Sequence, residues 1–234
     1  MLSNKYISAP AGAGKTYYIA ENIKELVRSG VEASDILCVT FTNMASRNLI
    51  NRVPEGVNVG TIHGLIYSKL KSVKGLNIVS TSSYNHLLEN ILESKLIEPT
   101  AKNRNLISNS ISHLINFIVY TYKCSDYNQF RQLITEPNVY ARYCATFNNR
   151  TSFSARTVFD AIVMMYRYLD EYGYLTFEDI IVRGIYECRM NVNYIYVDEF
   201  QDVTYLEYKA IKSLNPNSKM CVLGDLNQSI YGWR

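Results

Sequence analysis

A glycine-rich turn near the N-terminus, APAGAGKT at residues 9–16, constrains the fold of this chain more than any other feature. It fits a relaxed phosphate-loop pattern, A-x-x-G-x-G-K-T, in which Ala9 takes the place of the usual first glycine. KYIS before the turn can form a short strand, and apolar residues recur at helical spacing in TYYIAENIKELVRSG after it. Strand, turn and helix in this order surround a phosphate with backbone N–H groups and a helix N-terminus.

The turn supplies a set of candidate phosphate ligands: Ala9, Gly12, Ala13, Gly14, Lys15 and Thr16. Within this set the Lys15 ammonium can reach the β/γ oxygens of a triphosphate, and the Thr16 hydroxyl can ligate Mg²⁺. The alternative is a flexible Gly/Ala turn that opens an ordinary helix. The strand and helix expected on either side favour the phosphate loop, so a nucleoside triphosphate and Mg²⁺ are the predicted cofactors.

Composition restricts the class of protein more than its activity. The chain has 234 residues, of which 47% are hydrophobic, and no apolar run approaches the roughly 18 residues of a membrane span. Its five cysteines are odd in number, lack a CxxC pair and are typical of reduced thiols. The N-terminus has no apolar run of signal-peptide length. These features predict a soluble, cytoplasmic protein without a membrane partner, and the net charge of +3 leaves any nucleic-acid affinity to a local surface.

Apolar runs that end in polar residues predict buried parallel strands whose carboxyl ends form a site, at DILCVTFT (35–42), YIYVDE (194–199) and KMCVLGD (219–225). Helical stretches separate the runs, which is typical of an α/β domain with a parallel sheet and helices on both faces. From 76 to 171 the pattern changes to long, helix-periodic segments with Asn-rich and Ser-rich breaks. We therefore expect a mostly helical insertion at 76–171 that interrupts one α/β domain, formed by 1–75 and 172–234.

Two carboxylates close the strand expected at 194–199. Asp198 and Glu199 occur in the same chain as the phosphate loop, an arrangement that suits Mg²⁺ and water. Asp198 would hold the metal through its water shell, and Glu199 would position or deprotonate the attacking water. Taken alone, the pair could equally be a solvated acidic turn.

Six segments resemble, in order, the motifs of the UvrD/Rep/PcrA type of superfamily 1 DNA helicases: APAGAGKT, TFTNMASRNL (40–49), VGTIHGLIYSKL (59–70), GYLTFEDII (173–181), YVDEFQDVTYLE (196–207) and VLGDLNQSIYGWR (222–234). Block 76–171 falls where that family inserts a helical subdomain into its first RecA-like domain. The resemblance implies the N-terminal, ATP-binding half of an ATP-dependent DNA helicase. ATP and Mg²⁺ are the implied cofactors, and single-stranded DNA is the implied partner.

The resemblance also implies roles for single residues. Glu199 would be the catalytic base, Gln228 would sense the γ-phosphate, and Arg234 would reach the same phosphate. The implied DNA-binding residues are Phe41, Asn43, His63 and Trp233, with Phe41 and Trp233 stacking on bases. Stacking tolerates any sequence because every base has a π-face, and a motor that moves along DNA needs that tolerance.

The DNA-binding residues have plainer alternatives. Phe41 could be a core residue at the end of an apolar strand, His63 a structural histidine, and Trp233 a hydrophobic tether. Arg47 and Arg52 are by default a solvated basic face and only second a phosphate contact.

Members of this family carry a second RecA-like domain after the segment that corresponds to QSIYGWR. That domain supplies an arginine that completes the ATP site and the other half of the DNA track. We therefore expect an ATP hydrolase that is incomplete as an isolated chain and that works with a second chain carrying this domain. The alternatives are a stand-alone nucleotide-dependent DNA-binding or regulatory module and another P-loop enzyme, such as a small-molecule kinase. TFTN and NQSIYGWR argue against a kinase, which needs neither segment.

Overall fold

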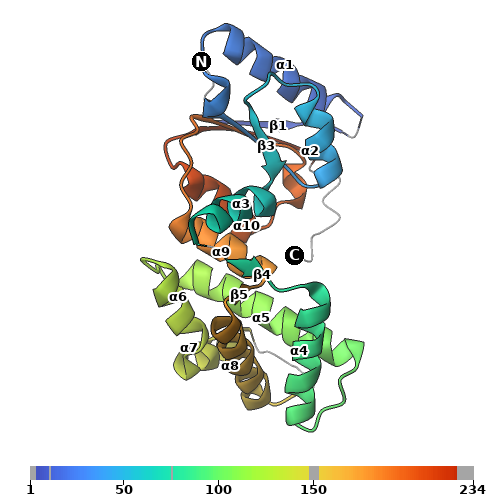
Figure 1. Cartoon of the computed structure of the whole chain (residues 1–234), viewed down its shortest axis with the longest axis vertical. Coiled ribbons are helices and arrows are strands. Elements are labelled where there is room, and N and C mark those ends of the chain that lie inside the picture. Colours follow the sequence, from blue (N-terminus) through green and yellow to red (C-terminus); the bar gives the residue numbers. More distant parts are fainter. Residues whose placement is uncertain (1–3, 11, 75, 148–152, 226–234) are drawn as a thin grey trace. The chain divides into compact units, whose positions relative to one another are not determined.

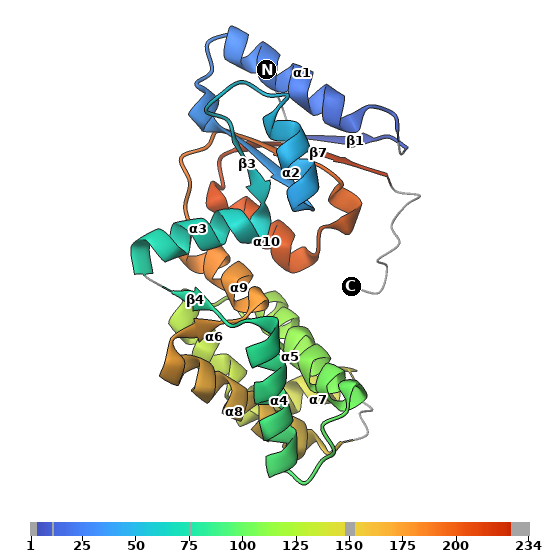
Figure 2. The same cartoon turned by 45° about the vertical axis from the view of Figure 1, so that its right-hand side comes forward.

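The computed structural model describes residues 4–10, 12–74, 76–147 and 153–225 (Figure 1 and Figure 2). The chain divides into two compact units. One comprises Met1–Lys69 together with Cys188–Arg234, and the other comprises Leu70–Glu187.

The first unit is built on a five-stranded sheet in the order β1-β7-β6-β2-β3, and every pairing in it is parallel. Its strands are β1 (Lys5–Ser8), β2 (Ile36–Thr40), β3 (Asn58–Thr61), β6 (Tyr194–Val197) and β7 (Lys219–Gly224). All five residues of β2 are buried, as expected for a central parallel strand covered on both faces. The predicted α/β fold with a parallel sheet is confirmed.

Helices and short 3-10 turns connect these strands: α1 (Lys15–Arg28), η1 (Ala33–Asp35), α2 (Asn43–Ile50), α3 (Ile62–Lys74), η2 (Phe200–Asp202) and α10 (Tyr205–Leu214). Ile19 and Ile23 of α1 and Leu49 of α2 pack in one core cluster with Cys38 and Tyr196 of the sheet. Residues next to these on the strands, such as Val39 and Val197, face the opposite way and line a pocket with Ile211 of α10. The sheet therefore has helices on both faces, with α1 on one side and α10 on the other (Figure 2).

The second unit is mostly helical. Its helices are α4 (Thr81–Ser94), α5 (Ala101–Thr121), α6 (Tyr127–Ile134), α7 (Pro137–Phe147), α8 (Ala155–Tyr172) and α9 (Phe177–Glu187), with a short parallel pair, β4 (Asn77–Ile78) and β5 (Tyr174–Leu175). Ser80, Thr100, Asp126 and Ser154 cap α4, α5, α6 and α8, each accepting a hydrogen bond from a first-turn N–H group.

The helical unit is longer than the helix-periodic segments of the sequence predict. Residues 70–75 and 172–187, which the sequence analysis assigned to the α/β domain, belong to the helical unit, Leu70–Glu187. The physical reason is Asp179 of α9, which is buried and accepts hydrogen bonds from the hydroxyls of Tyr127 at 3.3 Å, Tyr166 at 3.4 Å and Thr176 at 2.9 Å. Burial raises the pKa of this carboxyl, and the nearby Arg131 opposes the rise. The segment GYLTFEDII is thus anchored by a polar cluster inside the helical unit.

Within the ranges that the structure describes, no helix combines the length and the apolar character needed to cross a membrane.

Candidate nucleotide-binding site

The glycine-rich turn between β1 and α1 has the backbone of a phosphate-binding loop. Gly12 and Gly14 have φ angles of 75° and 81°, in the left-handed region that side chains rarely allow. Gly14 stands at the N-cap of α1 and brings no side chain to cap the first N–H groups of that helix. Gly12, Ala13 and Gly14 are all exposed. The turn therefore presents backbone donors and the positive end of a helix to solvent, where an anion can bind.

Lys15 lies between the loop and the end of β6. Its side chain is buried, and its Nζ atom is 3.4 Å from the carbonyl oxygen of Ala9 and 3.4 Å from Oε2 of Glu199. The N–H group of Ala9 in turn donates to the carbonyl of Gly224 at 3.0 Å, which ties the loop to the end of β7. The ammonium is thus held at the loop by two groups that follow different strands, Ala9 after β1 and Glu199 after β6.

Thr16 and Asp198 form the second contact between α1 and β6. The Thr16 hydroxyl donates to Oδ2 of Asp198 at 2.9 Å, and the Asp198 N–H group donates to the carbonyl of Val39 at 2.9 Å. Burial raises the pKa of the Asp198 carboxyl, and the charge of Glu199 raises it further. The Thr16 hydroxyl and, more weakly, Lys15 act in the opposite direction because they stabilise the ionised form.

This pair of oxygen ligands fits Mg²⁺. Hydroxyl and carboxylate oxygens are the hard ligands that Mg²⁺ prefers, and the ion usually keeps several waters and substrate phosphates besides one or two protein ligands. The described part of the chain holds no cluster of three or more His, Cys, Asp or Glu side chains that could bind a metal by themselves. The donor set therefore suits a metal that arrives with a nucleotide.

Glu199 occupies an unusual backbone conformation. Its φ and ψ angles are 52° and 48°, in the left-handed region, which is rare for residues other than Gly, Asn and Asp. Its N–H group donates to Oδ1 of Asp198 at 3.1 Å, and its Oε2 faces Lys15. Left-handed residues that persist in a fold cluster at active sites, and this one turns the Glu199 carboxylate toward the phosphate loop.

Gln201, which the sequence analysis did not single out, holds Glu199 in place. Its Nε2 donates to Oε2 of Glu199 at 2.9 Å, and its Oε1 accepts from the N–H group of Asp225 at 3.0 Å. Gly224 leaves room for it, since a Cβ there would lie 2.8 Å from Oε1 of Gln201. A glutamine two residues after Glu199 was the only sequence signal, and its role depends on β7 lying next to β6.

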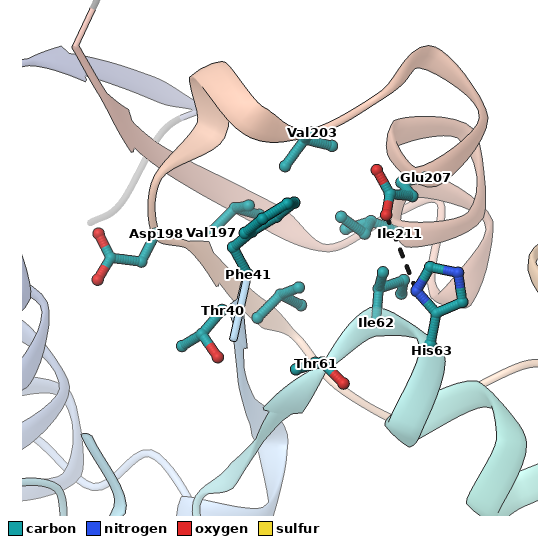
Figure 3. Close-up of a pocket in the computed structure, with 11 residues that line it drawn as sticks. Thr40, Phe41, Thr61, Ile62, His63, Val197, Asp198, Val203, Glu207 and Ile211 are labelled. Atoms are coloured by element: carbon teal, nitrogen blue, oxygen red, sulfur yellow. Dashed lines mark ion pairs between the residues drawn. The ribbon is translucent and has the colours of Figure 1, made fainter. Parts of the chain in front are cut away.

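Phe41, Asn43 and His63 lie where β2 and β3 give way to α2 and α3. Phe41 is half-buried, Asn43 begins α2 and is exposed, and His63 is half-buried in the first turn of α3. Phe41 and His63 line one pocket together with Asp198 and Glu207 (Figure 3). The pocket has a volume of about 30 Å³, which suits a water molecule and is far too small for a base or a nucleotide.

Gln228, Trp233 and Arg234 lie outside the described residues. The structure therefore brings together Lys15, Thr16, Asp198 and Glu199 at one edge of the sheet, with Phe41 and His63 near the same edge.

The family model of the UvrD/REP helicase N-terminal domain matches residues 2–234. The chain belongs to this family. The UvrD/REP match extends over both units, and it confirms the resemblance to UvrD/Rep/PcrA-type helicases that the six motifs carry.

Relatives of this chain are similar along nearly all of it. It is 28% identical over 247 residues to the ATP-dependent DNA helicase PcrA of Leuconostoc citreum, an alignment that covers 97% of this chain and 31% of the relative. It is 26% identical over 249 residues to the ATP-dependent DNA helicase PcrA of Staphylococcus aureus strain Mu50, covering 97% and 32%. The corresponding protein of Staphylococcus epidermidis is 27% identical over 245 residues, again covering 97% and 32%. The chain thus spans just under a third of the length of these relatives.

Proposed function

We propose that this chain is the ATP-binding part of an ATP-dependent DNA helicase or translocase, and that it binds Mg-ATP and single-stranded DNA. The observation that carries the proposal is the meeting of Lys15 and Thr16, from the start of α1, with Asp198 and Glu199, from the end of β6. In an open parallel sheet, ligands bind outside the carboxyl ends of the strands, and all four residues lie there.

In this proposal the loop N–H groups bind the phosphates, and Lys15 exchanges its contact with Glu199 for the β/γ oxygens of ATP. In the structure Nζ of Lys15 lies 3.4 Å from Oε2 of Glu199. When bound at Thr16 and Asp198, Mg²⁺ neutralises charge on the phosphates. Glu199, released from Lys15 and still held by Gln201, would accept a proton from the water that attacks the γ-phosphorus, while the bond from that phosphorus to the β–γ bridging oxygen breaks and ADP leaves.

Single-stranded DNA would bind beside the nucleotide, at the ends of β2 and β3. Phe41 offers an aromatic face for base stacking, and Asn43 and His63 offer polar groups to the backbone. The mild net charge of +3 favours a mode of binding in which few phosphates are neutralised. We therefore expect a preference for single strands over duplex, little sequence preference and a shallow dependence on salt.

Full hydrolysis would need a second RecA-like domain that lies outside these 234 residues. The relatives are about three times as long as the part that this chain matches, so there is room in them for such a domain. An arginine supplied from a second domain or a partner raises the rate by about 10³–10⁵ in the NTPases where its effect is known.

The proposal is tested by titrating the chain with Mg-ADP in a calorimeter and with labelled single-stranded DNA in an anisotropy assay. We expect both ligands to bind, and duplex DNA of the same length to bind more weakly. Nucleotide binding without any DNA binding would contradict the helicase proposal and favour another P-loop activity. Failure to bind nucleotide would contradict the phosphate loop itself.

A further inference from the structure

The two carboxylate oxygens of Glu207, in the first turn of α10, have different partners. Oε2 accepts hydrogen bonds from the N–H group and from the hydroxyl of Thr204, each at 2.8 Å. The N–H group of Glu207 donates back to the Thr204 hydroxyl at 3.2 Å, which completes a capping box at the start of α10. Oε1 lies 3.8 Å from Nδ1 of His63 (Figure 3).

The cap connects directly to the turn that carries Glu199. The N–H group of Asp202 donates to the carbonyl of Glu199 at 3.0 Å, and that of Val203 donates to the carbonyl of Phe200 at 3.1 Å. Thr204 follows at once and is fixed by Glu207. A short, hydrogen-bonded segment therefore joins the cap at Glu207 to Glu199.

The contact of Glu207 Oε1 with His63 leads to the surface where we propose that DNA binds. His63 stands in the first turn of α3, and the side chain of Thr61 accepts from the N–H group of Gly64 at 3.2 Å at the same turn. The side chain of Glu207 is only 13% exposed, whereas that of His63 is 34% exposed and reaches the surface near Phe41. A DNA phosphate at this surface would compete with Glu207 for the imidazole.

The charge of Glu207 is more than the cap requires. A capping box works with glutamine as well as with glutamate, because one oxygen at this position suffices to accept the N-cap N–H group. The second oxygen, Oε1, is not used by the cap of α10. It faces His63, and the Glu207 side chain is largely buried. Oε1 of Glu207 is therefore available to His63, whose Nδ1 lies 3.8 Å away.

We propose that Glu207 is a positioning residue that couples DNA contact at His63 to the conformation of Glu199 in the nucleotide site. The inference rests on the proposed function, because it assumes that nucleotide and DNA bind at these two places. The proposed coupling is thermodynamic and therefore reciprocal. If nucleotide changes the affinity of the chain for DNA by some factor, DNA changes its affinity for nucleotide by the same factor. Glu207 is the residue through which that factor arises.

The experiment measures this coupling factor with the full 234-residue chain. The affinity for a labelled oligo-dT is measured by anisotropy with and without saturating Mg-ADP, and the affinity for Mg-ADP is measured with and without oligo-dT. In the wild type we expect the two ratios to agree at about fivefold or more. Glu207→Gln keeps the cap and removes the charge, so its ratio should fall to about one while its affinity for Mg-ADP alone stays within about twofold.

Two further variants separate coupling from stability. Ser213→Gly weakens α10 at its far end without a change of charge, and it should keep the wild-type ratio. The double variant of Glu207→Gln with His63→Gln should show no further loss of coupling beyond either single change, because both act on one contact. If Glu207→Gln does not fold, His63→Gln tests the same contact from the other side.

A wild-type ratio that persists in Glu207→Gln and in His63→Gln would overturn the inference. So would a wild type that binds both ligands with no coupling between them. A wild type that fails to bind nucleotide or DNA would instead contradict the proposed function, so the two failures are told apart by the binding of each ligand alone.

Discussion

Thr16 and Asp198 are joined by a 2.9 Å hydrogen bond, although their positions in the sequence differ by 182. The bond places the first turn of α1 against the end of β6, and it brings together a hydroxyl and a carboxylate that suit Mg²⁺. The whole helical unit lies between these two residues in the chain. The candidate site is therefore assembled by the sheet, in which β6 is the strand next to β7 and β7 is the strand next to β1.

Lys15→Ala should abolish binding of Mg-ATP. The ammonium is buried at the loop, and no other lysine lies in this turn to replace it. The matched control is Lys24→Ala, nine residues further along the same helix, whose Nζ pairs with Glu21 at 2.8 Å. Isothermal titration calorimetry should show binding for the control and none for Lys15→Ala. Equal affinity in the two variants would contradict the assignment of the loop.

Asp198→Asn should make the protein more stable and less able to bind Mg-nucleotide. Burial raises the pKa of Asp198 in the folded state above its unfolded value, so its contribution to stability is present below the unfolded pKa and lost as pH rises through the folded pKa. At pH 7 the wild type carries the cost of a buried charge, which the amide avoids. We expect a higher Tm for the variant at pH 7 and no gain below about pH 4.

The control for this variant is Glu32→Gln, at an exposed carboxyl, which should leave Tm nearly unchanged. Thermal melts between pH 3 and pH 8 measure both variants. A lower Tm for Asp198→Asn at pH 7 would show that the charge of Asp198 stabilises the fold through Thr16 and Lys15 by more than burial costs.

Gln201→Ala should lower the rate of ATP hydrolysis and leave the affinity for Mg-ATP within about twofold of wild type. The change removes the 2.9 Å hydrogen bond to Glu199 and the 3.0 Å bond from Asp225. A catalytic group displaced by about 1 Å can lower the rate about 10²-fold. Steady-state hydrolysis with the second RecA-like domain supplied measures the effect, with the exposed Gln132→Ala as control. An altered affinity with an unaltered rate would make Gln201 a binding residue instead.

Phe41→Ala should weaken binding of single-stranded DNA by about 1–3 kcal/mol, the usual worth of one stacked base. Phe41 is half-buried beside the pocket, so its removal should lower Tm only slightly. The control is Met44→Ala. Met44 lies on α2 and is 75% exposed, so this change should alter neither the DNA affinity nor Tm. A large fall in Tm with unchanged DNA affinity would show that Phe41 is a core residue.

The parts of the fold that depend on local pattern could be predicted from the sequence. The buried strands were recognisable because parallel strands covered on both faces read as apolar runs, and the phosphate loop because its glycines, Lys15 and Thr16 are adjacent in the chain. The strand expected at 35–42 is shorter in the structure, Ile36–Thr40, because Thr42 leaves the sheet to cap α2. Ends of elements depend on such caps, which periodicity does not resolve.

Features that depend on which segments become neighbours could not be predicted. Gln201 acts through the backbone of Asp225, and that contact exists only because β7 lies beside β6. The reach of the helical unit to Glu187 depends on Asp179, whose hydroxyl partners lie on α6, α8 and the turn before α9. Neither relationship can be seen in the periodicity of apolar residues, because each is made by a single polar side chain.

The most direct test of the account is the rate of ATP hydrolysis by the 234-residue chain with single-stranded DNA, measured before and after a second RecA-like domain from a relative is added. We predict a rate barely above background for the chain alone and a rise of about 10³-fold or more on addition, which Glu199→Gln abolishes. Rapid DNA-stimulated hydrolysis by the chain alone, or hydrolysis that persists in Glu199→Gln, would contradict the account.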